Sequence, residues 1–136
     1  MLELFPKDQT NFSPSIPDGE VNYFPSFLST NEADILFAKL LATTPWQSDS
    51  ITVYGKTYDQ PRLTSLHAID ETSYSYSNIT MQPNPMTPVL SAILKKIETY
   101  SKHSFNAVLL NLYRDGKDSN GWHADNEKEL GKNPVI

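Results

Sequence analysis

The stretch Asn111-Leu-Tyr-Arg-Asp-Gly-Lys-Asp-Ser-Asn-Gly-Trp-His-Ala-Asp-Asn-Glu127 lies near the C-terminal end of the chain, and the interpretation of the whole sequence starts from it. The apolar run Phe105–Tyr113, which leads into it, has the composition of a β-strand. Gly116 and Gly121 allow the backbone to turn sharply after the strand. The stretch therefore predicts a strand and then a loop that presents a His-x-Asp pair, with a further acid two residues later.

His123 and Asp125 are residue types that bind iron. An imidazole and a carboxylate make up two of the three ligands of the 2-His-1-carboxylate triad, which holds Fe(II) on one face and leaves other positions open. A His-x-Asp pair alone is a weak motif, because most such tripeptides are ordinary surface sequence. The strand before it adds weight, since it is apolar enough to be central in a sheet and to give the ligands a rigid platform. A third ligand has to come from elsewhere.

Two polar residues of that strand indicate a bound small acid. Asn111 and Tyr113 alternate with Leu110 and Leu112, so their side chains share one face of the strand. A polar side chain inside an apolar strand needs a hydrogen-bond partner if it is buried. An acidic small molecule beside the metal would supply that partner, and we interpret Asn111 and Tyr113 as its contacts.

Length and composition limit the class of protein. A chain of 136 residues suits one domain, and 38% hydrophobic content is typical of globular proteins. No apolar run approaches the ~20 residues of a membrane helix, and the N-terminus has no signal-peptide pattern. We therefore expect an intracellular protein, cytoplasmic or nuclear, that is monomeric and has no membrane partner. The absence of Cys excludes disulfides and thiolate metal sites.

The charge distribution gives no general sign of a nucleic-acid partner. The formal net charge is −5, and residues 1–72 carry four basic against ten acidic side chains. Residues 73–136 carry seven basic against six acidic ones. Any face that contacts phosphates would therefore have to be local, and dispersed lysines of this kind more often form only a solvated surface.

Local signals predict two helices. Residues 1–20 are rich in Pro, Asp and Ser and predict an irregular arm, and Val21–Leu28 predicts an extended or edge segment. Ser29–Glu32 has the pattern of a capping box, so a helix should begin there and run to about Ala42. Thr87 followed by Pro88 predicts the N-cap and first position of a second amphipathic helix.

The region between these helices has β and loop patterns. Ile51–Tyr54 and Thr57–Tyr58 predict a hairpin that turns at Gly55-Lys56. Gln60–Thr64 predicts a further extended piece, and residues 68–86 predict a loop-dominated segment that forms a surface lid. Helices and strands without regular βαβ alternation favour an α+β fold, in which both helices pack on one side of a mainly antiparallel sheet.

The order of these motifs is similar to a known family. Asn-x-Tyr followed by His-x-Asp resembles the AlkB family of Fe(II)- and 2-oxoglutarate-dependent dioxygenases, and most closely its branch that repairs alkylated nucleic acids. The likeness covers most of the chain from about residue 20 onward, namely Gln60–Thr64, Tyr74–Ser77, Gln82–Pro88, Phe105–Glu127 and Glu129–Ile136. The resemblance implies a double-stranded β-helix, or jelly-roll, core that is incomplete at the C-terminus, within a single dioxygenase domain over residues 21–136.

The resemblance also implies cofactors and ligands. His123 and Asp125 would bind Fe(II), and Asn111 and Tyr113 would hydrogen-bond 2-oxoglutarate as co-substrate. The family's second His ligand and its co-substrate Arg lie beyond Ile136, so we expect the 136 residues alone to be inactive. His67 and His103 stay unassigned, because each is more ordinary as a surface or packing histidine. That reasoning leaves the second His ligand unidentified.

The implied reaction is oxidative demethylation of N-alkylated bases in DNA or RNA. It would consume O2 and release succinate and formaldehyde. By resemblance, three residues would recognise the alkylated nucleotide: Glu127, Arg62 and Tyr76. Two alternatives stay open at this point. One is a non-catalytic fragment that binds nucleic acid or protein, and the other is a dioxygenase that acts on a protein or lipid, because the acidic first half is a poor match for DNA.

Overall fold

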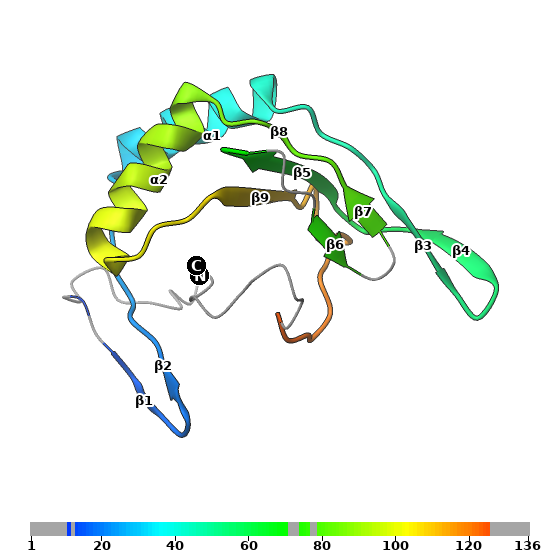
Figure 1. Ribbon diagram of the computed structural model, residues 1–136, viewed down its shortest axis with the longest axis horizontal. Coiled ribbons are helices and arrows are strands. Elements are labelled where there is room, and N and C mark those ends of the chain that lie inside the picture. The colour runs from blue at the N-terminus through cyan, green and yellow to red at the C-terminus, as the bar shows by residue number, and fades with distance from the viewer. Residues whose placement is uncertain (1–10, 12, 71–73, 77–78, 126–136) are drawn as a thin grey trace. The chain divides into compact units, whose positions relative to one another are not determined.

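The computed structural model describes residues 11, 13–70, 74–76 and 79–125 (Figure 1). Backbone contacts divide the chain into two compact units, Met1–Ala42 and Thr43–Ile136. The described residues form two α-helices and several small β-sheets, so the predicted mixed α+β class is confirmed. Within this part of the chain, no helix has the length and apolar character needed to cross a membrane.

The first unit contains a minimal hairpin and a helix. Strands β1 (Ser15–Ile16) and β2 (Gly19–Glu20) pair antiparallel within the segment predicted to be irregular. In the predicted extended segment Val21–Leu28, Tyr23 forms a single β-bridge and the chain then turns at Pro25 and Ser26. Helix α1 (Thr30–Thr43) begins at the predicted capping box: the Glu32 carboxylate accepts from the Ser29 N–H at 2.9 Å, and the Ser29 hydroxyl accepts from the Glu32 N–H at 3.2 Å.

The second unit opens with a hairpin of strands β3 (Ser50–Val53) and β4 (Lys56–Asp59), seen in Figure 1. Its turn is Tyr54-Gly55, one residue earlier than the predicted Gly55-Lys56. Both turn residues have positive φ, 50° and 76°. A two-residue type I′ turn requires positive φ at both central positions, and placing Gly55 second satisfies one of them without steric cost.

A three-stranded sheet with the order β8-β5-β9 lies next in the chain (Figure 1). Strand β5 (Leu63–Ala68) pairs antiparallel with β9 (Ala107–Leu112) along its whole length and parallel with β8 (Asn84–Pro85) at its end. The sequence predicted that the apolar strand before the loop would be central. Among the described strands, β5 has neighbours on both sides and β9 pairs with β5 on one side, so the central place of β9 stays a prediction.

Three of the six residues of β5 are polar and buried, and their hydrogen bonds explain why the strand tolerates them. Thr64, Ser65 and His67 are 1%, 0% and 2% exposed. The Thr64 hydroxyl donates to the Asp49 carboxylate at 2.9 Å. His67 Nδ1 lies 2.9 Å from the Pro85 carbonyl oxygen and Nε2 lies 3.1 Å from the Ser65 hydroxyl. Buried polar groups are tolerated when each has a partner, so a polar sequence here forms the centre of the sheet.

The predicted loop-dominated segment over residues 68–86 contains more regular structure than expected. Strands β6 (Tyr74–Tyr76) and β7 (Ile79–Met81) form an antiparallel hairpin, and β8 follows within the proline-rich stretch. Met81 is 2% exposed and belongs to the core. The segment was mispredicted because its strands are two or three residues long, too short for a period-2 pattern to show.

Helix α2 (Pro88–Ser101) begins as predicted. The Thr87 hydroxyl accepts from the Leu90 N–H at 3.3 Å, and Pro88 occupies the first turn. Leu90 and Leu94 of its apolar stripe are buried. The Glu98 carboxylate accepts from the Phe105 N–H at 2.9 Å, which ties the helix to the segment that becomes β9. The packing of α1 and α2 on one side of a sheet stays a prediction.

Candidate functional site

The candidate site begins at the end of β9. Exposure alternates along this strand, and Asn111 lies on its more exposed face while Leu110 and Leu112 are partly covered. Tyr113, the next residue, is 46% exposed. The predicted alternation of polar and apolar residues is therefore present, and it places the Asn111 side chain where a ligand can reach it.

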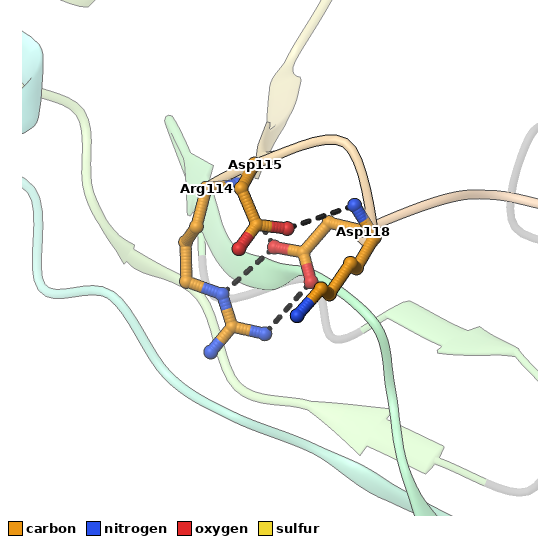
Figure 2. Close-up of polar contacts among 4 residues, drawn as sticks. Arg114, Asp115 and Asp118 are labelled. Carbon is orange, nitrogen blue, oxygen red and sulfur yellow. Dashed lines mark hydrogen bonds and ion pairs between the residues drawn. The ribbon is translucent and has the colours of Figure 1, made fainter.

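The loop after β9 is closed by an ion pair (Figure 2). Arg114 donates from Nε and Nη2 to the two carboxylate oxygens of Asp118, at 2.7 and 2.9 Å. The Arg114 backbone N–H donates to the same carboxylate at 2.8 Å, and Asp115 accepts from the Lys117 N–H at 2.8 Å. The Arg114 side-chain hydrogen bond, followed by its backbone hydrogen bond, lowers the pKa of Asp118 to about 2. The same contact raises the pKa of Arg114.

The loop is also attached to the start of β5. The Ser119 N–H donates to the Pro61 carbonyl oxygen at 2.9 Å. Arg62 donates from Nη1 to the Asn120 amide oxygen at 3.1 Å and from Nε to the Asn111 amide oxygen at 3.0 Å. One guanidinium thus links the predicted co-substrate contact on β9 to the loop that carries the predicted metal ligands.

His123 and Asp125 are brought together by this loop. His123 Nε2 lies 3.5 Å from Asp125 Oδ1, and the two side chains are 52% and 46% exposed. His123 Nδ1 lies 2.8 Å from the Gly121 carbonyl oxygen. A carbonyl oxygen only accepts, so Nδ1 donates to it, and Nε2 is the ring nitrogen that faces the Asp125 carboxylate. The backbone carbonyl thus orients the ring as it does in many metal-binding histidines.

This geometry fits two ligands of one metal ion. Bonds of about 2.1 Å from a metal to an imidazole nitrogen and a carboxylate oxygen span the 3.5 Å between the two atoms. In the part of the chain that the structure describes, no third His, Cys, Asp or Glu joins them to complete a metal-binding group. His67 is held in the core by Ser65 and Pro85, and His103 is exposed between α2 and β9.

The remaining predicted residues belong to the nucleotide-binding set. Arg62 contacts Asn111 and Asn120, and its role toward a nucleotide stays a prediction. Tyr76 lies on β6, and Glu127 lies outside the described residues. Sequence reasoning missed Asn120, because a lone surface asparagine carries no signal until its pairing with Arg62 is seen in space.

Comparisons with known proteins agree with the predicted chemistry. Residues 20–136 match the family model of the 2OG-Fe(II) oxygenase superfamily. The chain is 45% identical over 113 residues to the bovine alpha-ketoglutarate-dependent dioxygenase alkB homolog 3, and 43% identical over 114 residues to its human counterpart. It is 33% identical over 108 residues to the human DNA oxidative demethylase ALKBH2.

These matches cover most of this chain and a smaller share of each relative. They include 82%, 83% and 77% of the chain but 39%, 39% and 41% of the respective relatives. The chain thus spans about two fifths of the length of the curated relatives that it matches. The family model covers the whole second unit, including β9 and the loop with His123 and Asp125. The chain belongs to the 2OG-Fe(II) oxygenase superfamily, within its AlkB family.

Proposed function

We propose that this chain is part of an Fe(II)- and 2-oxoglutarate-dependent dioxygenase that oxidatively demethylates N-alkylated bases in DNA or RNA. The observation that carries the proposal is the His123–Asp125 pair, in which a backbone carbonyl fixes the ring and leaves Nε2 facing the carboxylate at 3.5 Å. Two of the relatives, an alpha-ketoglutarate-dependent dioxygenase and a DNA oxidative demethylase, support the same reaction.

In this proposal His123 and Asp125 hold Fe(II), and Asn111 and Tyr113 hold 2-oxoglutarate by hydrogen bonds. When bound, the iron and the co-substrate would supply the oxidation by O2: 2-oxoglutarate would be converted to succinate and CO2, and one oxygen atom would hydroxylate an N-methyl group. The hydroxymethyl group would then leave as formaldehyde, with its hydroxyl proton passing to the base nitrogen. The exposed face of β9 lets the Asn111 amide and the Tyr113 hydroxyl reach an anionic co-substrate. A base that is damaged or unpaired costs least to flip out of its stack.

The substrate side of the proposal involves Glu127, Arg62 and Tyr76, which would face the flipped base. We place them in one dioxygenase domain over residues 21–136, after an N-terminal arm of residues 1–20. Its core would be a double-stranded β-helix to which the sheets β8-β5-β9 and β6-β7 contribute. We further propose a monomeric, intracellular protein.

The test is turnover by the complete protein that contains this chain. Incubation with Fe(II), 2-oxoglutarate and N-methylated oligonucleotides should release succinate and formaldehyde in equal amounts. His123→Ala and Asp125→Ala should each lower turnover by about 100-fold or more, because each removes a metal ligand. Lys95→Met, an exposed change on α2, is the matched control. Absence of turnover, or turnover unaffected by both ligand variants, would contradict the proposal.

A second candidate is favoured by the charge of the first half. Residues 1–72 carry ten acidic against four basic side chains, which suits a protein or lipid substrate better than a polyanion. The two candidates differ in the salt dependence of oligonucleotide binding. Neutralised phosphates release counterions, so affinity for a nucleic-acid substrate should fall steeply as salt rises. Binding that is weak and insensitive to salt would favour the second candidate.

A non-catalytic fragment is the third possibility, and metal titration separates it from the other two. A complete site should bind Mn(II), a redox-stable substitute for Fe(II), at one equivalent. The binding should be lost in Asp125→Ala. Two ligands alone on an exposed loop should bind far more weakly, because metal affinity depends on the full ligand set and its supporting hydrogen bonds.

A further inference from the structure

The Arg62 guanidinium lies between two side-chain amides of the candidate site. Its Nε donates to Asn111 Oδ1 at 3.0 Å, and its Nη1 donates to Asn120 Oδ1 at 3.1 Å. Asn111 is 49 positions away in the chain and Asn120 is 58 positions away. Arg62 itself directly precedes β5, which is hydrogen-bonded to β9 along its length. The contact therefore connects the start of one strand to the end of its neighbour and to the following loop.

The chemistry of arginine fixes the orientation of the Asn111 amide. A guanidinium has donors and no acceptor, so only the oxygen of an amide can face it. The Asn111 NH2 group is therefore directed away from Arg62, and it can donate to a ligand. Without Arg62 the amide can turn over and present its oxygen, which would repel an anionic ligand. Arg62 thus orients the Asn111 amide so that its NH2 group, a hydrogen-bond donor, faces the ligand.

The second arm of the guanidinium acts on the loop. Asn120 precedes His123 by three residues, and the neighbouring Ser119 N–H donates to the Pro61 carbonyl oxygen at 2.9 Å. The loop is thus attached to the start of β5 by one backbone and one side-chain hydrogen bond just before its metal-binding pair. These attachments limit the positions that His123 and Asp125 can take.

We propose that Arg62 is a positioning residue that couples the 2-oxoglutarate contact to the metal-ligand loop, an inference that rests on the proposed function. It orients the Asn111 amide as a donor toward the anionic co-substrate and holds the His123–Asp125 loop through Asn120. This role is separate from contact with a nucleotide. It predicts a defect in co-substrate and metal binding that is already present when no nucleic acid is added.

The test measures binding to the complete protein without nucleic acid. Calorimetry at saturating Mn(II) should show that Arg62→Met binds 2-oxoglutarate with about tenfold lower affinity than the wild type. A loss of this size corresponds to one well-oriented hydrogen bond to a charged group. Arg62→Lys should rescue only part of the affinity, because a single ammonium lacks the fork that reaches both amides. Lys95→Met should bind as the wild type does. An Arg62→Met variant whose affinity for 2-oxoglutarate is within twofold of the wild-type affinity would overturn the proposal.

Asn120→Ala separates the two arms of Arg62. It should weaken Mn(II) binding several-fold and leave 2-oxoglutarate affinity at saturating Mn(II) unchanged, since the Asn111 contact remains. Asn111→Asp should keep its contact with Arg62 and its resistance to urea, and lose 2-oxoglutarate binding because a carboxylate has no donor. An Asn120→Ala variant with unchanged Mn(II) affinity would contradict the loop arm of the proposal.

A spectroscopic measurement keeps this inference distinct from the proposed function. In the ligand-free protein, the side-chain NH2 signal of Asn111 should show a rigid amide by 15N relaxation, and Arg62→Met should make it mobile. An Asn111 amide that is equally mobile in wild type and variant overturns the positioning role. A wild-type protein that has a rigid Asn111 amide but binds no 2-oxoglutarate instead overturns the proposed function, and the coupling to co-substrate falls with it.

Discussion

The Asp118 carboxylate accepts three hydrogen bonds from Arg114, two from the guanidinium and one from the backbone N–H. Hydrogen bonds to the charged form of a carboxyl group favour ionisation, and they lower the pKa of Asp118 from 3.8 to about 2. A carboxyl group whose pKa is lower in the folded loop stabilises that loop at pH values above 3.8. The contribution is lost as pH falls from 3.8 toward 2, where the carboxylate becomes protonated.

We therefore predict a pH-dependent opening of the loop that follows β9. The hydrogen-exchange protection factor of the Arg114 amide should be constant above about pH 4 and decrease between pH 4 and 2, because its acceptor is the Asp118 carboxylate. In Asp118→Asn the protection should be lower and should not vary over this range. The Leu66 amide in β5 serves as the reference for global unfolding. Equal loss of protection at Arg114 and Leu66 would show that the whole domain unfolds instead.

Single residues of the site differed in how well they could be predicted. His123 and Asp125 were predicted as metal ligands from residue type and spacing, and Asn111 and Tyr113 as co-substrate contacts from the two-residue period of a strand; these roles stay predictions. All four lie in one continuous stretch of the chain, so residue type and spacing within that stretch are enough to single them out. The partners of Arg62 could not be predicted in this way, since its contact with Asn120 joins residues 58 positions apart.

At the scale of elements, local hydrogen bonding specified the helix starts. The capping box at Ser29 and the hydroxyl cap at Thr87 were both confirmed, because each needs partners only three residues away. The turn of the β3–β4 hairpin was displaced by one residue from its predicted place. Its position depends on which residue adopts positive φ, and here Tyr54 does so at 50°.

Tyr54 therefore provides a stability prediction for the hairpin. Its side chain is 101% exposed, so its replacement removes no packing. Left-handed backbone costs an ordinary residue about 1–2 kcal/mol, and asparagine tolerates it better. Tyr54→Asn should stabilise the protein by about 0.5–1 kcal/mol, measured by urea unfolding with amide exchange of β3 and β4.

The matched control for this hairpin is Tyr58→Asn. Tyr58 lies on β4, is 53% exposed and belongs to a regular strand pair with Ile51. Asparagine is disfavoured in strands, so this variant should be neutral or less stable. If Tyr54→Asn destabilises the hairpin as much as Tyr58→Asn does, the positive φ of Tyr54 does not cost the protein stability.

At the scale of the whole molecule, the centre of the sheet is held by polar residues. His67 donates from Nδ1 to the Pro85 carbonyl oxygen on β8 and accepts at Nε2 from Ser65 on β5. Asn84 adds hydrogen bonds from its amide to the Ser65 hydroxyl and to the Leu66 carbonyl oxygen, at 3.4 and 3.1 Å. This network attaches the short parallel strand β8 to β5, where only two backbone pairs connect them.

His67→Leu should therefore destabilise the second unit strongly. Leucine has a volume similar to that of histidine but cannot form hydrogen bonds, so the Ser65 hydroxyl and the Pro85 carbonyl oxygen each lose their contact with the ring. A buried polar group left without a partner costs about 1–3 kcal/mol of stability. We expect a loss of about 2–4 kcal/mol in urea unfolding. His103→Leu, an exposed change, should alter stability by less than about 0.5 kcal/mol. A His67→Leu loss as small as that of His103→Leu would show that the network adds little.

The sequence by itself determined the features that depend on near neighbours: the α+β class, both helix starts and the strand before the loop. Each follows from hydrogen bonds or side-chain periods within a few residues. The tertiary structure decided which strand is central and what Arg62 contacts. Polar residues such as Ser65 and His67 are predicted to lie at the surface unless partners are known, and their partners are supplied by distant segments, which only the folded chain brings together.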